Sequence, residues 1–182
     1  MTASSLRADC ARCAALCCVA LAFDHSALFA FDKPAGEPCP NLSPTCRCRI
    51  HDTLAVSGFP GCAAYDCHGA GPYVTQQIFG GRSWRDDPRL LAPMMDAFAQ
   101  IREIHEMRGL VAAALKFIWP RRERETLEAF SARLEPAEGW SLDSLDQGVG
   151  VELVDDIRRY LRKLGPHVRS RARVESAEAE AR

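Results

Sequence analysis

The sequence comprises 182 residues, of which 47% are hydrophobic and 26% are charged, and its formal net charge is −1. This length accommodates one compact domain or a small domain with a helical appendage, and the composition is ordinary for a soluble globular protein. A balanced charge gives no electrostatic basis for binding nucleic acid or an acidic membrane surface, so we expect neither partner.

The first predicted element is a short helix over residues 8–23, where Asp9 is a suitable N-cap and an alanine- and leucine-rich run follows. Residues 24–70 are rich in Pro, Gly, Asp and Cys and show no sustained periodicity, although a short helix fits 51–57. A stretch of this length without secondary structure is uncommon in a compact domain unless something other than a core holds it. Metal ligation would hold it, because metal binding and folding are linked.

Longer helices are predicted from residue 88 onward. Apolar residues recur at helical spacing over 88–118, and Pro120 prevents that helix from continuing. Further helices fit 123–134 and 151–164, and a stop is predicted at Gly165 and Pro166. The sequence therefore predicts a mostly α protein with an irregular cysteine-rich metal-binding knuckle within 1–87, about three helices within 88–166 and a flexible tail over 167–182.

The cysteines are confined to the first part of the chain, and none occurs after residue 67. They are Cys10, Cys13, Cys17, Cys18, Cys39, Cys46, Cys48, Cys62 and Cys67. Dense cysteine in a short chain is also typical of secreted, disulfide-bonded proteins, but an odd number leaves one thiol unpaired. The apolar run 14–23 contains two cysteines, lacks a convincing cleavage site, and is shorter than the roughly 20 residues that span a bilayer. We therefore expect a cytoplasmic protein with reduced thiols and no membrane segment.

Cysteine spacing favours metal ligation over burial of free thiols as small hydrophobic residues. If residues 8–23 formed one helix, Cys10, Cys13, Cys17 and Cys18 would lie within an arc of about 140°. Thiolates select zinc, copper(I) or iron–sulfur clusters, and four per site is usual. The nine cysteines are therefore enough for two sites with one thiol to spare. The adjacent pair Cys17 and Cys18 could serve two metals, or one of them could pack.

These spaced elements resemble the bacterial CxxCxxCC family, which is described as zinc- or iron-chelating. The matching elements are Cys10, Cys13, Cys17, Cys18, the run 39–42 (Cys-Pro-Asn-Leu), the run 48–51 (Cys-Arg-Ile-His), Pro60, Cys62 and Tyr65. The resemblance covers about residues 8–70 and implies zinc or iron, including an iron–sulfur cluster, as the cofactor. The predicted ligands are Cys10, Cys13, Cys17, Cys18, Cys39, Cys48, Cys62 and Cys67. Cys46 falls outside the family pattern and is predicted to be the spare thiol.

A second resemblance extends further along the chain. Residues 31–42, 65–71 and 79–84 are similar to the N-terminal region of some actinobacterial pentapeptide-repeat proteins. That similarity reaches roughly residue 118, and no pentapeptide repeat follows it here. A function that depends on the repeat solenoid therefore does not transfer to this chain.

Other residues have alternative roles. The adjacent Cys67 and His68 could form a nucleophile and base, although no third member of a triad is indicated. His51 and His68 could replace cysteines as ligands, whereas His105 is expected on a solvated helix face. The glycine pair within 79–84 is interpreted as a turn with an aromatic anchor, since it lacks the spacing of a phosphate loop.

Three functions are compatible with these patterns. The first is a small cytosolic metal-binding protein that holds zinc or iron. The second is an iron–sulfur-dependent enzyme, because flagellin lysine methylases are similar in their cysteine motif. The third is a module that binds a protein partner through the helices from residue 88 onward.

Overall fold

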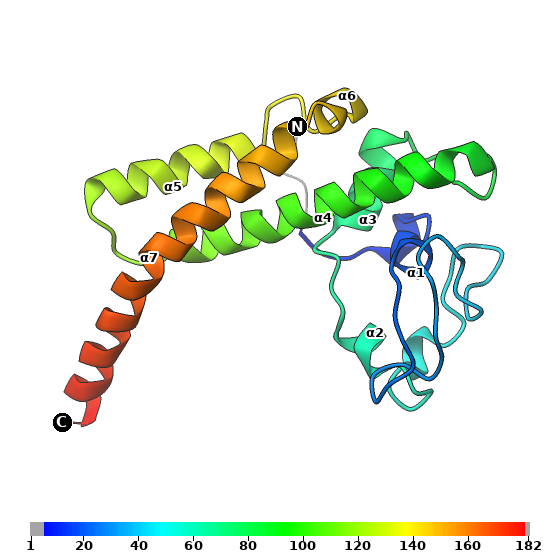
Figure 1. Cartoon of the computed structure of the whole chain (residues 1–182), viewed down its shortest axis with the longest axis horizontal. Helices are drawn as coiled ribbons and strands as arrows, with labels where there is room; N and C mark the ends of the chain where they lie inside the picture. The colour runs from blue at the N-terminus through cyan, green and yellow to red at the C-terminus, as the bar shows by residue number, and fades with distance from the viewer. Residues whose placement is uncertain (1–5, 181–182) are drawn as a thin grey trace.

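The computed structural model describes residues 6–180, with side chains described as far as residue 166. Within this range the chain forms helices and no strand, so the prediction of a mostly α protein is confirmed (Figure 1). Isolated bridges pair only Phe23 with Lys33, Ser26 with Phe29, and Leu42 with Cys48 among these residues. The elements are η1 (Cys10–Arg12), α1 (Leu16–Ala20), η2 (His51–Thr53), α2 (Pro60–Ala64), α3 (Ala70–Tyr73), η3 (Val74–Ile78), η4 (Pro88–Leu90), α4 (Leu91–Ala114), α5 (Arg121–Leu134), α6 (Leu142–Asp146) and α7 (Val149–Glu180).

The predicted single helix over residues 8–23 is wrong. The chain instead forms the short 3₁₀ turn η1 and the separate helix α1, because Ala15 adopts the left-handed conformation with φ 57° and ψ 40°. The backbone N–H of Ala14 turns away to donate to Thr75 Oγ1 at 3.0 Å. The first four cysteines therefore do not share one face of a continuous helix, and the arc of about 140° does not describe them.

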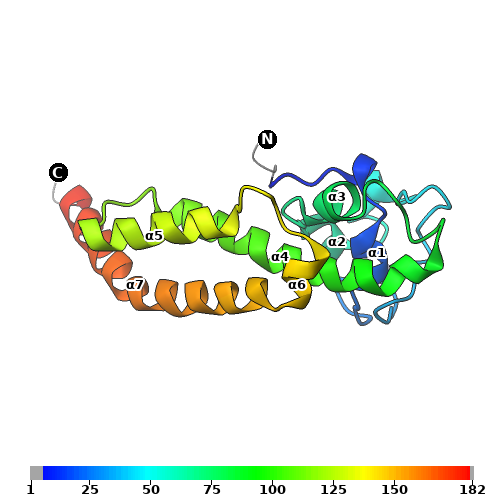
Figure 2. The same cartoon turned by 90° about the horizontal axis from the view of Figure 1, so that it is seen from above.

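Helix α4 is the central element, and α5 and α7 run beside it (Figure 2). Its buried face includes Met94, Phe98, Ile101 and Ile104. Burial of a side chain of this size contributes about 1.5–3 kcal/mol. The predicted helices over 88–118 and 123–134 are confirmed, with ends that shift by a few residues.

Helix α7 passes through the predicted stop at Gly165 and Pro166, so that prediction is wrong. Proline inside a helix removes one backbone donor and favours a bend, and Figure 1 shows α7 changing direction part-way along its length. The predicted tail over 167–182 continues the helix as far as Glu180, and residues 181–182 lie outside the described part.

The cysteine-rich region packs against one end of α4, as both Figure 1 and Figure 2 show. Leu16 and Val19 of α1 are fully buried in the same hydrophobic core as the α4 side chains. A small aromatic cluster supports the adjoining loops, and its Phe23 and Phe29 rings stack with centroids 4.4 Å apart. The short helix predicted over 51–57 is only the 3₁₀ turn η2. Helices α2, α3 and α6 were not predicted because four or five residues are too few to show a periodicity.

No described helix is both long enough and apolar enough to cross a membrane.

Candidate metal centre

All nine cysteines lie in the described part of the chain and all are free thiols. As the described side chains stand, no group of three or more His, Cys, Asp or Glu residues is arranged to hold a metal ion. The sulfur atoms of Cys17 and Cys18 lie 3.9 Å apart.

Cys10, Cys13, Cys17 and Cys67 form what we call the first thiol group. Burial raises the pKa of Cys13 to about 11, and the thiols of Cys67 and Cys10 add to the rise. Burial also raises the pKa of Cys10, with Cys67 as the next contributor. Cys17 belongs with them because Cys13 and Cys10 contribute, after its hydrogen bond with Cys18 and its burial, to its raised pKa. Cys10, Cys13 and Cys67 therefore lie within electrostatic reach of one another, and Cys17 interacts with Cys13 and Cys10 as well as with Cys18.

Because Gly71 has no side chain, the thiols of Cys13 and Cys67 can lie close to its backbone. A Cβ on Gly71 would lie 2.6 Å from Cys13 Sγ and 4.0 Å from Cys67 Sγ. Neighbouring side chains fix the segment that carries Cys13, since Ala14 donates to Thr75 Oγ1 and its carbonyl accepts from Trp84 Nε1 at 2.7 Å. The first thiol group is therefore placed by α3 and η3 and by the turn that follows them.

Cys18, Cys39, Cys48 and Cys62 form the second thiol group. Burial raises the pKa of Cys62 to about 11, and the thiols of Cys18, Cys39 and Cys48 add to the rise. Burial also raises the pKa of Cys39, to which Cys18 and Cys48 contribute. The backbone ties these positions together, because Cys39 N donates to Cys18 O at 3.0 Å and Cys48 bridges to Leu42.

The adjacent residues Cys17 and Cys18 join the two groups. The sulfurs of Cys17 and Cys18 lie within hydrogen-bonding distance, and this contact raises the pKa of Cys17 and lowers that of Cys18. Cys18 interacts with Cys39, Cys48 and Cys62, and also with Cys10 of the first group. The interactions therefore run across both groups through the adjacent residues Cys17 and Cys18.

A buried lysine that the sequence did not single out lies beside the second group. The side chain of Lys33 is 3% exposed. Its ammonium donates to the carbonyl oxygens of Val19, Pro34 and Glu37 at 3.2, 2.9 and 2.9 Å. Burial lowers the pKa of Lys33, and the Cys39 and Cys18 thiols oppose this. A lysine in a Pro- and Gly-rich segment is normally solvated, so no sequence signal indicated its position.

Cys46 and the two candidate ligand histidines have other contacts. Cys46 Sγ lies 3.9 Å from Ser83 Oγ, and Cys46 is not among the residues that perturb the thiols of the second group. His51 is exposed with Nδ1 3.4 Å from Asp52 Oδ1, and His68 Nδ1 lies 3.9 Å from Asp66 Oδ2. The structure therefore pairs each histidine with a neighbouring carboxylate.

The expectation that His105 lies on a solvated helix face is wrong, because this residue is 1% exposed. Its Nδ1 lies 2.7 Å from the carbonyl oxygen of His68, and a carbonyl only accepts, so Nδ1 carries the proton. Burial lowers the pKa of His105 to about 4. The imidazole is therefore neutral near pH 7. Its hydrogen bond fixes the backbone carbonyl of His68, the residue that follows Cys67.

The glycine pair Gly80 and Gly81 forms a turn with both φ angles positive, and Trp84 beyond it is buried. The interpretation of residues 79–84 as a turn with an aromatic anchor is confirmed.

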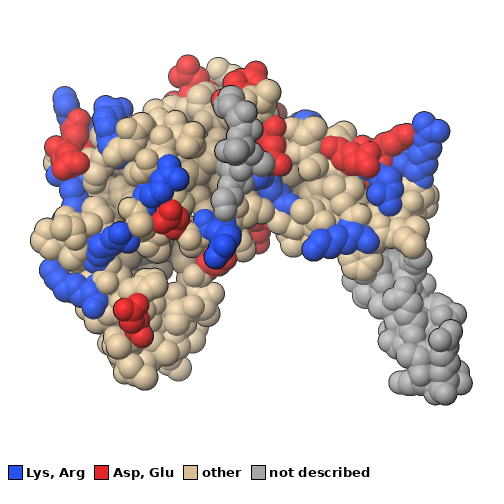
Figure 3. Space-filling view, turned by 180° about the vertical axis from the view of Figure 1, so that it is seen from behind, with Lys and Arg blue, Asp and Glu red and all other residues tan. Residues whose placement is uncertain are grey.

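A cavity of about 940 Å³ is present, and no cysteine is among the described residues that line it. Asp9 and Arg12, which flank Cys10, line it together with Tyr73, His105 and Trp140. On the face seen in Figure 3, Lys and Arg are interspersed with Asp and Glu, so this face presents no continuous basic stripe.

The chain is similar to the uncharacterized protein YybG of Bacillus subtilis (strain 168), with 46% identity over 110 residues. The match covers 60% of this chain but only 39% of the length of that relative. No family model matches the sequence. No solved structure matches it either.

Proposed function

We propose that this protein binds metal through eight cysteine thiolates arranged as two centres. The first centre uses Cys10, Cys13, Cys17 and Cys67, and the second uses Cys18, Cys39, Cys48 and Cys62. The observation that supports the proposal is the gathering of nine free cysteines within residues 10–67, eight of them half-buried. Four thiolates are the usual donor set of a structural zinc site or an iron–sulfur cluster.

The surroundings of the thiols support a metal more than they support simple burial. Cys13 Sγ lies directly against Gly71, where a Cβ would be only 2.6 Å from the sulfur. The loops that carry the second group contain little regular structure, and they pack through the small aromatic cluster and through Leu42, which lies in the main hydrophobic core. A bound metal supplies folding free energy to such a segment.

Zinc and iron both suit this donor set, because thiolates are soft ligands. A bound zinc would act as a structural cross-link, whereas an iron–sulfur cluster would add electron transfer. The proposal places the protein in a reducing compartment such as the cytoplasm, where thiols stay available for ligation.

Elemental analysis and an absorption spectrum of anaerobically purified protein test this proposal. We expect about two zinc ions or two iron-containing centres per chain, and a broad absorption near 400 nm if clusters are present. Cys39→Ser is expected to lower the metal content to about one centre, whereas Cys46→Ser should leave it unchanged. Protein that is purified without metal, and that takes up none when it is supplied, would refute the proposal.

The cavity lined by Asp9, Arg12 and Tyr73 favours a second candidate, an iron–sulfur-dependent enzyme. Its volume of about 940 Å³ is in the range of small-molecule sites, and Asp9 and Arg12 lie within two positions of Cys10 in the sequence. The resemblance of the cysteine motif to that of flagellin lysine methylases suggests methyl transfer to lysine. Incubation of the metal-loaded protein with S-adenosylmethionine and lysine-containing peptides tests this, and the absence of any methylated product would count against it.

A further inference from the structure

The cavity of about 940 Å³ is bordered by segments that are far apart in the sequence. Pro72 and Tyr73 line it from α3, His105 lines it from α4, and Leu134 and Trp140 line it from the end of α5 and the connection that follows. His105, Leu134 and Trp140 are buried, so this wall of the cavity is largely apolar and aromatic. A cavity of this size with apolar walls and a few polar groups is typical of a small-molecule site.

The charged side chains around the cavity balance one another. Among the described residues that line it, three are arginines and three are carboxylates, namely Arg7, Arg12, Arg108, Asp9, Glu135 and Glu138. Arg108 and Glu135 form an ion pair with each other. A site without net charge has no long-range attraction for an ion of either sign. The ligand that this cavity suits is therefore an uncharged one.

The hydroxyl group of Tyr73 has a hydrogen-bond donor to spare. Its oxygen accepts from the backbone N–H of Trp140 at 2.9 Å, and within the described part of the chain its own O–H has no acceptor. A Cβ on Gly139 would lie 3.0 Å from the same oxygen, so a glycine at this position lets the connection approach the hydroxyl closely. A ligand can therefore accept a hydrogen bond from Tyr73 without breaking one that already exists.

His105 offers the complementary group, an acceptor. Its Nδ1 donates to the carbonyl oxygen of His68 at 2.7 Å, and the ring is neutral near pH 7 because burial lowers its pKa to about 4. Nε2 is therefore an acceptor, and no described residue donates to it. The imidazole lies edge-on to the Tyr73 ring, with centroids 5.2 Å apart. Neighbouring rings in one wall of the cavity thus leave one donor and one acceptor for a ligand.

We propose that this cavity binds a small uncharged molecule that carries an amide group, with its carbonyl oxygen on the Tyr73 hydroxyl, its N–H on His105 Nε2 and its apolar part against Leu134 and Trp140. An amide presents an acceptor beside a donor, which matches the two groups that the wall leaves without partners. This inference is independent of the proposed metal-binding function. It concerns the same cavity as the second candidate function but requires neither a cluster nor methyl transfer.

The test uses the full chain as purified, with benzamide as the probe because it joins an aromatic ring to an amide. Acetophenone has nearly the same shape but lacks the N–H donor, and benzoate replaces that donor by a negative charge. Binding is followed through the indole N–H resonances of ¹⁵N-labelled protein. The chain has three tryptophans. Trp140 lines the cavity, whereas Trp84 and Trp119 are not among the described lining residues and serve as internal controls.

We expect benzamide to shift the Trp140 indole resonance with a dissociation constant in the millimolar range, as is usual for a ligand of few atoms. Acetophenone and benzoate should bind about 3- to 10-fold more weakly, because each leaves His105 Nε2 without a donor. Tyr73→Phe removes the O–H and should weaken benzamide binding by a similar factor. Tyr160→Phe is the matched control, since Tyr160 is also half-buried but packs against Phe130, and it should bind as the wild type does.

An unshifted Trp140 resonance, or equal affinity for the three probes, would overturn the proposal. Tighter binding of benzoate would also overturn it, because it would indicate a site for anions, and so would unchanged benzamide affinity in Tyr73→Phe. If Tyr73→Phe does not fold, the ranking of the three probes on the wild type decides. A chain that takes up no metal but binds benzamide with the expected ranking would refute the proposed function and support this inference, so the two failures are distinguishable.

Discussion

Replacement of Gly71 by alanine places a methyl group against the first thiol group. The new Cβ would lie 2.6 Å from Cys13 Sγ, whereas ordinary contacts begin at 3.4 Å, so the sulfur must move by about 1 Å. Alanine is favoured over glycine in a helix by about 1 kcal/mol, and overpacking costs about 1–3 kcal/mol. We therefore expect the metal-free protein to lose only about 0–2 kcal/mol in free energy of unfolding.

Metal binding should be affected far more than stability, because metal–ligand distances tolerate only about ±0.2 Å. We expect the zinc affinity of the first centre to fall by about 100-fold or more, beyond what loss of a supporting contact causes. The second centre should be unchanged. Urea unfolding of the metal-free chain and zinc titration with per-cysteine alkylation measure the two effects separately.

Gly109→Ala is the matched control. Gly109 lies in α4, and apart from its chain neighbours and the backbone of its own helix no heavy atom lies within 4 Å of the position that the new methyl group would take. This variant should gain about 1 kcal/mol in stability and bind zinc as the wild type does. If Gly71→Ala bound two equivalents of zinc with wild-type affinity, the assignment of Cys13 and Cys67 to one centre would be refuted.

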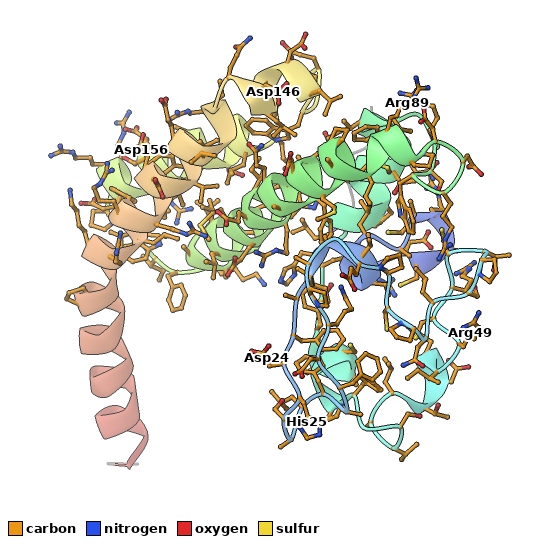
Figure 4. The ribbon with its side chains drawn as sticks, turned by 45° about the vertical axis from the view of Figure 1, so that its right-hand side comes forward. Asp24, His25, Arg49, Arg89, Asp146 and Asp156 are labelled. Atoms are coloured by element: carbon orange, nitrogen blue, oxygen red, sulfur yellow. The ribbon has the colours of Figure 1, made fainter. Side chains whose placement is uncertain are left out.

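Two further predictions concern the scaffold around the thiols. Burial lowers the pKa of His105 from 6.5 to about 4, so between these values the unfolded chain binds a proton that the folded chain does not. The free energy of unfolding should therefore fall by up to about 3 kcal/mol as the pH drops from 7 to 4. Urea titrations should show this fall in the wild type and in the control variant His25→Gln, whose exposed site is labelled in Figure 4. The fall should be much smaller in His105→Gln. An equal fall in all three proteins would contradict the role of His105. Thr75→Val leaves the buried N–H of Ala14 without its acceptor, which should cost about 1–3 kcal/mol in urea unfolding. A cost near zero would show that this hydrogen bond does not fix the segment carrying Cys13.

The sequence predicted the elements that have a long repeating pattern. Helices α4 and α5 follow from apolar residues at helical spacing and from Pro120. The separation of η1 from α1 could not be predicted, because alanine carries no signal for the left-handed conformation that Ala15 adopts. The passage of α7 through Pro166 was also missed, since a proline normally ends a helix.

The cysteine cluster was predictable in composition but not in its arrangement. The helical arc predicted for the first four thiols is wrong, because Ala15 separates η1 from α1, and Cys67 lies near Cys13 beside Gly71. The burial of Lys33 and His105 depends on contacts between segments far apart in the sequence. Periodicity and composition contain no information on such contacts.

Native mass spectrometry of the anaerobically purified chain, followed by alkylation, tests the two-centre account most directly. The account predicts a mass that corresponds to two bound metal centres and eight displaced thiol protons, with Cys46 the cysteine that is readily alkylated. Removal of the metal should make the other eight cysteines reactive. A chain that carries no metal under these conditions and exposes all nine thiols at similar rates would contradict the account.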